Sequence, residues 1–255
     1  MPSDRNPRQV AILAEIHKRG RVYVDALAQS LNATPQTIRR DLQILSDAHE
    51  IMRFHGGATL PAGTEYTDFE VRTKIAAEEK RAIGAAVAAR IPHNTFVMIN
   101  AGTTTASVAR NLESHFGLNL LTDNVALANE IRQFPGVEVI VPGGTLRRSD
   151  GAILGGMALD FLKQFRADVA VIGAAAIDHE GNLYDFDTNE VLITREMIKL
   201  SKHVILAVDS TKFGNTAPIF IDDLSGVQTL VTDRPSDTLI SLCNREGIEL
   251  VTAGR

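Results

Sequence analysis

The stretch from Thr34 to Leu42, Thr-Pro-Gln-Thr-Ile-Arg-Arg-Asp-Leu, constrains the fold more than any other part of the chain. Thr34 is a favoured N-cap residue, because its hydroxyl can accept a hydrogen bond from an unpaired amide of the first helical turn. Pro35 suits the first helical position, where a missing N–H costs nothing. Ile38, Leu42 and Leu45 follow at i, i+4 and i+7. This spacing predicts a helix with one buried face.

A second short apolar pattern, Val24 to Leu31, lies just upstream, and the link Asn32–Thr34 has the length of a turn. The pair therefore predicts a helix-turn-helix. Ile51–Gly57 alternates in polarity and ends in Gly-Gly, which predicts a β-hairpin behind the second helix, the wing of a winged helix. The alternative to a DNA-binding unit is an ordinary pair of helices whose arginines are solvated. The predicted hairpin favours the DNA-binding interpretation.

Exposed residues near the N-terminus of such a helix reach base edges and phosphates when it enters a major groove. The predicted contacts to double-stranded operator DNA are Thr34, Gln36, Thr37, Arg39 and Arg40 on the helix, with Arg53 and His55 on the hairpin.

Charge and composition fit two domains of different character. The chain has 255 residues, 44% of them hydrophobic, and a net charge of −5. Residues 1–56 carry eight Lys/Arg and six Asp/Glu, which gives +2 and leaves −7 for the rest. An acidic remainder argues against non-specific coating of nucleic acid or membrane.

No apolar run approaches the ~20 residues that a membrane-spanning helix needs. Met1–Arg5 opens no secretion signal, and Cys243 is the only cysteine, so a cytoplasmic protein is expected. The seven histidines have no metal-ligand spacing, and neither a Gly-x-Gly-x-x-Gly turn nor a P-loop occurs. We therefore expect no metal and no cofactor.

Beyond residue 75, short apolar runs alternate with helical patterns, which predicts an α/β domain with a mostly parallel sheet covered on both faces. The predicted strands are 96–99, 118–121, 137–141, 169–172, 204–208, 230–232 and 248–251, and the predicted helices are 78–91, 108–112, 126–134, 159–165, 190–201 and 237–246. The predicted organisation is a winged helix-turn-helix domain at 1–57, a linker at 58–75 and a larger domain at 76–255.

Ligands bind at the carboxyl ends of strands in such sheets. Four strand ends carry polar or glycine-rich turns: Asn100–Thr105, Thr122–Asn124, Pro142–Gly144 with Arg147 just beyond, and Asp209–Lys212. Backbone amides at a helix N-terminus, joined by hydroxyls, suit a phosphate. Each turn alone could be an ordinary strand-to-helix connection, whereas together they indicate one small anion site.

Two segments within the first 58 residues resemble a known family. Pro35–Leu42 and Arg53–Ala58 resemble the N-terminal signature of the DeoR family of bacterial transcriptional regulators. Tyr23 departs from it, because relatives usually have a small capping residue before the first helix of the pair. The resemblance continues in the larger domain, which in that family is similar in fold to sugar-phosphate isomerases and deaminases.

The resemblance implies an effector site around a phosphorylated ligand. The resemblance and the strand-end turns together assign to this site Asn100, Gly102, Thr103, Thr104, Thr105, Thr122, Asn124, Gly143, Gly144, Arg147, Asp209 and Lys212. Asn100 departs from the family, which usually carries Asp there, and an amide cannot act as a general base. The segment Gly181–Val191 resembles DeoR regulators of glycerol 3-phosphate metabolism, so its Asp185, Asp187 and Glu190 either read ligand hydroxyls or cap a helix.

These observations predict a non-enzymatic repressor, a homo-oligomer (dimer or tetramer), released from its operator by a phosphorylated metabolite, glycerol 3-phosphate. The alternatives are a DeoR-type repressor responding to another sugar phosphate and a sugar-phosphate isomerase or deaminase with a DNA-binding appendage. For the enzyme, Glu190 or Asp209 would be the base, and Asn100 counts against it. Activation in place of repression stays open, since the sign depends on operator position.

Overall fold

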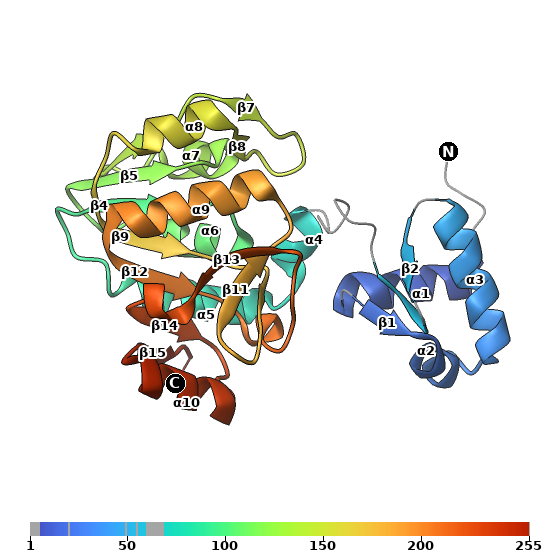
Figure 1. Cartoon of the computed structure of the whole chain (residues 1–255). Coiled ribbons are helices and arrows are strands. Elements are labelled where there is room, and N and C mark those ends of the chain that lie inside the picture. The colour runs from blue at the N-terminus through green and yellow to red at the C-terminus, as the bar shows by residue number, and fades with distance from the viewer. Residues whose placement is uncertain (1–5, 20, 49, 55, 60–68, 255) are drawn as a thin grey trace. The chain divides into compact units, whose positions relative to one another are not determined.

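The computed structural model describes residues 6–19, 21–48, 50–54, 56–59 and 69–254 (Figure 1). The chain divides into two compact units, Met1–Thr67 and Asp68–Arg255. The first unit runs α1 (Pro7–Arg19), β1 (Arg21–Tyr23), α2 (Val24–Ser30), α3 (Pro35–Asp47), β2 (Met52–Phe54) and β3 (Gly57–Thr59). Its strands form an antiparallel sheet in the order β1-β3-β2. The winged helix-turn-helix prediction is confirmed.

Helix α3 forms for the reasons read from its sequence. The Thr34 hydroxyl accepts a 3.2 Å hydrogen bond from the Thr37 amide, and Pro35 occupies the first turn. Ile38, Leu42 and Leu45 are buried in the core of this unit. The capped start and the single apolar face leave the other faces of α3 outside that core.

The start of α2 is secured by the wing and not by a side chain. Tyr23 precedes α2 without a side-chain capping bond. Instead, the amide of Val24 donates a 2.9 Å hydrogen bond to the carbonyl of Gly56 in the turn between β2 and β3. Gly56 has a φ of +86°, which glycine adopts without steric cost. The hairpin therefore supplies the cap that Tyr23 does not.

The second unit is built on a seven-stranded sheet in the order β15-β14-β12-β9-β4-β5-β6, and every neighbouring pair is parallel. The strands of this sheet are β4 (Phe96–Ile99), β5 (Leu118–Thr122), β6 (Val137–Ile140), β9 (Ala167–Ile172), β12 (Ser201–Ala207), β14 (Thr229–Thr232) and β15 (Glu249–Thr252). All seven predicted strands are members of it.

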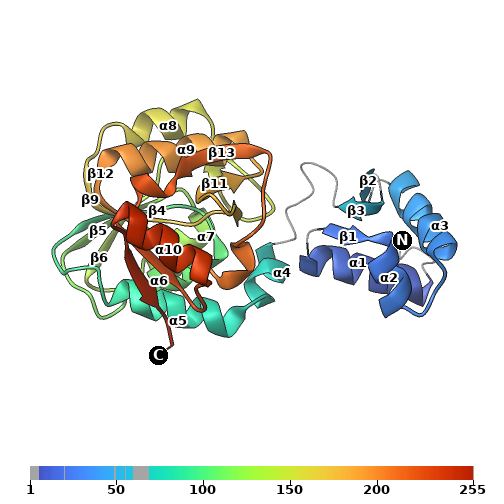
Figure 2. The same ribbon diagram turned by 60° about the horizontal axis from the view of Figure 1, so that its bottom comes forward.

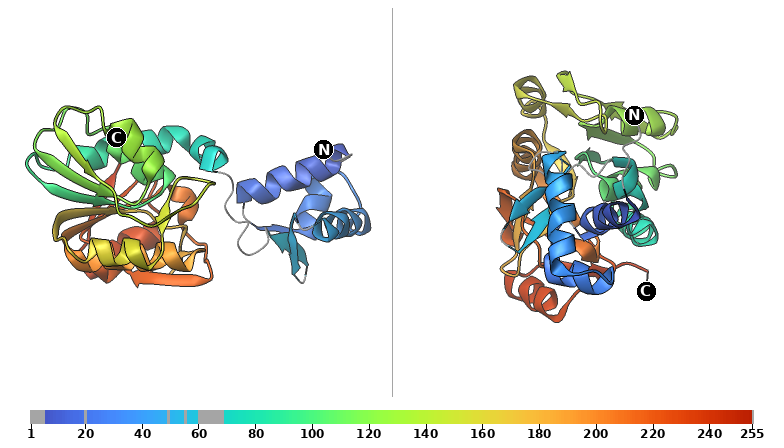
Figure 3. Two further views of the ribbon diagram at one scale, coloured as in Figure 1. Left: turned by 90° about the horizontal axis from the view of Figure 1, so that it is seen from above. Right: turned by 90° about the vertical axis from the view of Figure 1, so that its right-hand side faces the viewer.

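Helices cover both faces of this sheet, as Figure 2 and the left view of Figure 3 show. One face packs against α5 (Ala77–Ala88), α6 (Thr103–Arg110) and α7 (Val125–Ile131). The other packs against α8 (Gly156–Leu162), α9 (Thr188–Leu200) and α10 (Asp237–Glu246). Strand β4 shows the alternation that this requires: Val97 and Ile99 join the first core, and Met98 joins the second.

Two small sheets lie outside the predicted elements. One is antiparallel with the order β10-β11-β13, and the other pairs β7 with β8. The strands of these sheets are β7 (Thr145–Leu146), β8 (Ile153–Leu154), β10 (Ala176–Ile177), β11 (Asn182–Asp185) and β13 (Ile219–Asp223). They are short or mixed in polarity, so no sequence periodicity marks them, and two 3₁₀ turns, η1 (Ser210–Lys212) and η2 (Leu224–Gly226), complete the unit.

The range predicted as linker, residues 58–75, contains regular structure at both ends. Ala58 and Thr59 belong to β3, because they pair with β1 and β2 to complete the wing sheet. Helix α4 (Phe69–Lys74) follows within the second unit, and Phe69 packs against its core. The polar, turn-rich composition of this range gave no sequence pattern from which β3 or α4 could be predicted. Among the described helices, none is long and apolar enough to cross a membrane.

Candidate functional site

Helix α3 presents a polar face opposite its buried stripe. Gln36, Arg39, Arg40 and Gln43 are exposed, and Thr37 is half-buried. Thr34 is also exposed, but its hydroxyl is used for the helix cap. The first two turns of α3 therefore offer two guanidinium groups and one exposed amide side chain on one surface, which is the arrangement that groove-reading helices use.

The wing lies close enough to α3 to share a side-chain contact. Arg53 on β2 is exposed and donates a hydrogen bond to Oε1 of Gln43. Gln43 in turn donates to Oδ1 of Asp47 at 2.7 Å. Arg53 is therefore held beside the exposed face of α3, and His55, the other predicted wing contact, lies outside the described residues.

A buried carboxylate missed at the sequence level joins α3 to α1. Asp41 is 3% exposed and accepts hydrogen bonds from Arg8 Nε at 2.5 Å and Gln9 Nε2 at 3.1 Å. Burial alone would raise the pKa of Asp41, but the bonds from Arg8, Gln9 and Asn6 outweigh it, so the pKa lies below its usual value. The sequence did offer a signal for this contact, because Asp41 is a charged residue on the otherwise apolar face of α3.

In the second unit, the Asn100–Thr105 turn follows β4 and opens α6. Gly102 is the residue before the helix, and a Cβ built there would lie 2.8 Å from the Thr105 hydroxyl. That hydroxyl is buried and donates to the carbonyl of Asn100 at 2.8 Å. Thr105 therefore shapes the turn, whereas the hydroxyls of Thr103 and Thr104 have no partner among the residues that the structure describes.

The Asn100 side chain is engaged on both of its polar atoms. Its Nδ2 donates to the Thr194 hydroxyl on α9 at 3.1 Å, and its Oδ1 accepts from the Gly173 amide at 3.0 Å. A carboxylate at this position could make the first contact only in the reverse direction, by accepting from the Thr194 hydroxyl. Asn100 thus ties the carboxyl end of β4 to α9 and to the turn after β9.

The next strand end, Thr122–Asn124, combines a helix cap with a buried acid. Asn124 Oδ1 accepts from the Leu127 amide at 2.8 Å, and its Nδ2 donates to the Asp150 carbonyl at 3.0 Å. Asp123 is 1% exposed, and its Oδ1 has no hydrogen-bond partner among the described residues. Burial, followed by the negative charge of Glu190, raises the pKa of Asp123 to about 7.

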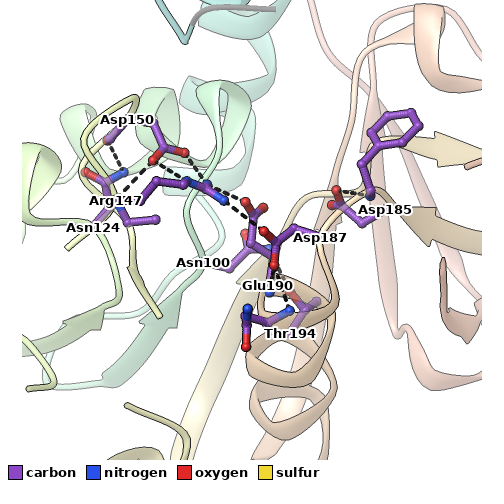
Figure 4. Close-up of polar contacts among 11 residues, drawn as sticks. Asn100, Asn124, Arg147, Asp150, Asp185, Asp187, Glu190 and Thr194 are labelled. Carbon is purple, nitrogen blue, oxygen red and sulfur yellow. Dashed lines mark hydrogen bonds and ion pairs between the residues drawn. The ribbon is translucent and has the colours of Figure 1, made fainter. Parts of the chain in front are cut away.

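Arg147 forms the centre of a cluster of acids drawn from two regions of the chain (Figure 4). It pairs through Nε with Asp150 Oδ1 at 2.8 Å, through Nη1 with Asp187 Oδ2 at 3.4 Å, and through Nη2 with Glu190. Burial opposes ionisation of Asp150, but the bonds from Arg147 reverse this and lower its pKa. Gly143 and Gly144, just before this cluster, are exposed.

The three acids of the Gly181–Val191 segment have different surroundings. Asp187 caps α9, since its Oδ1 accepts from the amides of Asn189 at 2.7 Å and Glu190 at 3.2 Å. Of the two roles considered for this residue, capping is therefore confirmed. Asp185 ends β11, and burial together with the charge of Glu190 raises its pKa. In Figure 4, Glu190 points toward Arg147 while Asp185 lies apart from the arginine cluster.

The end of β12 carries a second group of charges. Asp209 is buried and accepts from the Thr211 amide at 3.1 Å, while its Oδ2 lies 3.9 Å from Lys80 Nζ. Burial lowers the pKa of Lys212, and the nearby Asp209 only partly offsets this. Lys80 and Arg72, on α5 and α4, were not among the sequence predictions, because neither lies at a strand end.

The four predicted strand ends belong to β12, β4, β5 and β6. These strands lie in one stretch of the sheet, which runs β12-β9-β4-β5-β6. They bring buried carboxylates, Lys212 and Arg147 to one edge of the sheet, and α5 adds Lys80. Such a set can bind a phosphate through its cations and the amides that open α6, and hydroxyls through its carboxylates. Among the described residues, no group of three or more His, Cys, Asp or Glu side chains could hold a metal ion.

Comparison with known proteins agrees with this two-part organisation. Residues 8–64 match the DeoR-like helix-turn-helix domain, and residues 75–234 match the DeoR C terminal sensor domain. The chain is 38% identical over 228 residues to the glycerol-3-phosphate regulon repressor of Escherichia coli (strain K12), covering 89% of this chain and 90% of that protein. It is 38% identical to the HTH-type transcriptional repressor CsqR of the same organism, covering 96% and 95%.

Among solved structures, ribose 5 phosphate isomerase A from Neisseria gonorrhoeae is similar with a TM-score of 0.40 and 13% identity, covering 52% of each chain. The two domain matches span the helix-turn-helix and most of the parallel-sheet unit, and both belong to one family. On these grounds the chain belongs to the DeoR family of transcriptional regulators.

Proposed function

We propose that this protein is a transcriptional repressor that binds double-stranded operator DNA and leaves it when a small phosphorylated metabolite binds the second unit. The proposal rests on one combination: exposed Arg39 and Arg40 on a capped helix, and a strand-end cluster of buried cations and acids, in the same chain. The repressor names of the relatives, at 38% identity over most of both chains, support it.

On the DNA side, Arg39, Arg40 and Arg53 bind phosphates or base edges, and Gln36 and Thr37 lie near the bases. Thr34 acts through its helix cap, and His55 belongs to the same predicted surface. One winged helix buries limited surface, whereas specific complexes usually bury ~1,000–2,500 Å² of protein. We therefore propose a homo-oligomer, a dimer or tetramer, on repeated half-sites, which light scattering of the protein with and without operator tests. We propose that the protein is cytoplasmic, because it has to reach operator DNA.

On the effector side, we propose glycerol 3-phosphate, the metabolite in the name of one relative. Its phosphate binds the amides of Gly102–Thr105 and the ammonium of Lys212. Gly143 and Gly144 allow close approach of the backbone, and Asp185 and Glu190 accept hydrogen bonds from the ligand hydroxyls. Five of the remaining predicted residues hold these groups in position through the bonds described above: Asn100, Asn124, Arg147, Asp187 and Asp209. Thr122 does so by accepting a 3.3 Å hydrogen bond from the Asn124 amide.

We further propose that the protein is not an enzyme. An isomerase or deaminase needs a base positioned to abstract a proton. Glu190 is paired with Arg147. Asp209 Oδ1 is bonded by Thr211 and its Oδ2 lies 3.9 Å from the ammonium of Lys80, while the Asn100 amide cannot serve. Turnover of ribose 5-phosphate or glucosamine 6-phosphate by the purified protein would refute this.

The deciding experiment measures operator affinity with and without glycerol 3-phosphate, with fructose 1-phosphate and glucosamine 6-phosphate in parallel and unphosphorylated glycerol as the control. Typical couplings between two sites shift affinity about 5–150-fold. We expect glycerol 3-phosphate to weaken operator binding within this range and glycerol to have no effect. Release by a hexose phosphate alone would keep the repressor and change its effector, and no release by any phosphate ester would refute the proposed regulation.

A further inference from the structure

A buried carboxylate in the middle of α3 collects the side chains that open α1. Asp41 is 3% exposed, and three side chains from residues 6–9 donate hydrogen bonds to it. Arg8 Nε reaches Oδ2 at 2.5 Å, while Gln9 Nε2 and Asn6 Nδ2 reach Oδ1 at 3.1 Å and 3.5 Å. Burial would raise the pKa of Asp41, but these bonds outweigh it and lower the pKa. The carboxylate therefore carries its charge at neutral pH.

Asp41 lies at the border between the buried and the exposed face of α3. Residues three or four positions apart are neighbours on a helix surface. Ile38 and Leu45 flank Asp41 on one side and are buried. Thr37 and Ile44 flank it on the other side, where Thr37 is half-buried and Ile44 is exposed. The carboxylate therefore holds Arg8 beside the face of α3 that carries the predicted DNA contacts.

The contact with Asp41 uses only part of the Arg8 guanidinium. An arginine has five N–H donors, and the bond to Asp41 comes from Nε. Among the residues that the structure describes, the two Nη groups of Arg8 have no hydrogen-bond partner, and the side chain is 37% exposed. Gln9, in contrast, is 6% exposed and places its amide on the same carboxylate. Gln9 thus completes the buried contact, and Arg8 presents a cation with spare donors at the surface.

Stability gives only a weak reason for a cation at this position. An ion pair with one exposed partner typically contributes about 0–1 kcal/mol. Nucleic acid gives a stronger reason. A carboxylate left uncompensated beside a DNA-contacting face would repel phosphates, and Arg8 offsets its charge. The spare donors of a guanidinium also match the oxygens of a phosphate, which arginine can bind through two parallel hydrogen bonds.

We propose that Arg8 binds a phosphate of the operator backbone on the α1 side of α3, and that Asp41 positions it there. This proposal rests on the proposed function. It adds α1 to the DNA-contacting surface, which otherwise consists of α3 and the wing. A phosphate contact orients a protein on the duplex but reads no base. Its loss should therefore weaken binding to all sequences alike.

The experiment uses the full chain and two duplexes at several salt concentrations. One duplex is selected by the wild-type protein from a random-sequence pool, and the other has a mixed sequence. Arg8→Gln keeps a donor for Asp41 and removes the charge, so it should lower the slope of log K against log salt by roughly one unit. A fourfold rise in salt should then weaken the variant about 3–4-fold less than the wild type. The ratio of the affinities for the two duplexes should stay unchanged.

Two further variants separate the phosphate contact from a purely structural role of Arg8. Arg8→Lys keeps the charge and should keep the wild-type slope. Gln9→Ala removes a neutral bond to the same carboxylate, so it should lower the melting temperature and leave the slope unchanged. A wild-type slope in Arg8→Gln, or an equal loss of slope in Gln9→Ala, overturns the proposal. A changed ratio between the two duplexes overturns it as well, because it would indicate a base contact.

Should Arg8→Gln not fold, the double variant Arg8→Gln, Asp41→Asn replaces the ion pair by two neutral amides. Its slope should be roughly one unit lower than that of Asp41→Asn alone. Equal slopes in these two variants overturn the proposal. Failure of the wild-type protein to select any duplex refutes the proposed function itself, so the two failures are distinguishable.

Discussion

Asn100 and Thr194, 94 positions apart, are joined by a 3.1 Å hydrogen bond from the amide Nδ2 to the hydroxyl Oγ1. The bond connects the end of β4 with α9, and Asn100 Oδ1 completes the contact by accepting from Gly173. The amide supplies a donor and an acceptor at once. Asn100 therefore makes both contacts without burying a charge, whereas a carboxylate could reach Thr194 only by accepting from its hydroxyl.

Asn100→Asp should destabilise the protein and weaken effector binding. The substitution buries a charge and places an oxygen where Nδ2 now lies 3.5 Å from the Gly173 carbonyl, and an unsatisfied buried group costs about 1–3 kcal/mol. The new charge would also repel a phosphate at the adjacent Gly102–Thr105 turn. Thermal unfolding and ligand titration measure the two effects. Asn244→Asp, the same change at an exposed position of α10, is the control. An unchanged melting temperature would contradict the structural role of Asn100.

Replacing Arg39 and Arg40 by alanine should weaken operator binding and reduce its salt dependence. Each lost phosphate contact lowers the slope of log K against log salt by roughly one unit, and a lost base contact costs roughly 1–3 kcal/mol at one position. Operator titrations at several salt concentrations measure both. Arg245→Ala, an exposed arginine of the second unit, is the matched control. Operator binding that stays unchanged in the double variant would exclude this face of α3.

Asp41→Asn should destabilise the DNA-binding unit by about 1–3 kcal/mol at neutral pH, because it weakens the bonds that the buried Asp41 carboxylate accepts from Gln9 and from the half-exposed Arg8. The folded-state pKa of Asp41 is lowered, so its contribution is fully present above the unfolded pKa and is lost as pH falls through the folded pKa. Denaturant unfolding from pH 7 downward should show the advantage of the wild type shrink below about pH 4. The exposed Asp47→Asn serves as control, and an equal loss there would point to a general charge effect.

Asp123→Asn should change the pH dependence of stability in the opposite sense. The pKa of Asp123 is raised to about 7, so the folded state retains a proton that the unfolded state loses near pH 4. The contribution of Asp123 to the stability of the ligand-free protein therefore falls as pH rises from about 4 to 7, by an amount on the order of 2–4 kcal/mol. The variant should lack this contribution. Asp160→Asn, whose side chain is 76% exposed, should keep the wild-type profile. If the stability of Asp123→Asn and of the wild type changed with pH in the same way, the raised pKa of Asp123 would be contradicted.

Local patterns were sufficient for the main elements of both units. The cap at Thr34 and the stripe Ile38, Leu42 and Leu45 predicted α3, and its start at Pro35 is confirmed. Continuous apolar runs such as Phe96–Ile99 predicted each strand of the parallel sheet. Helix α4 and the strands β10, β11 and β13 were missed, because they are short and their stability comes from neighbours far away in the sequence.

The sequence by itself determined which residues would stand at the carboxyl ends of the strands, since that follows from strand limits and the direction of a parallel sheet. Only the tertiary structure decided which side chains meet there. Arg147 pairs with Glu190 across 43 positions, and Lys80 reaches Asp209 from a helix that no strand-end argument would examine. The reason is physical: helix and strand periodicities act over a few residues, whereas the pairing of buried charges depends on which elements pack together.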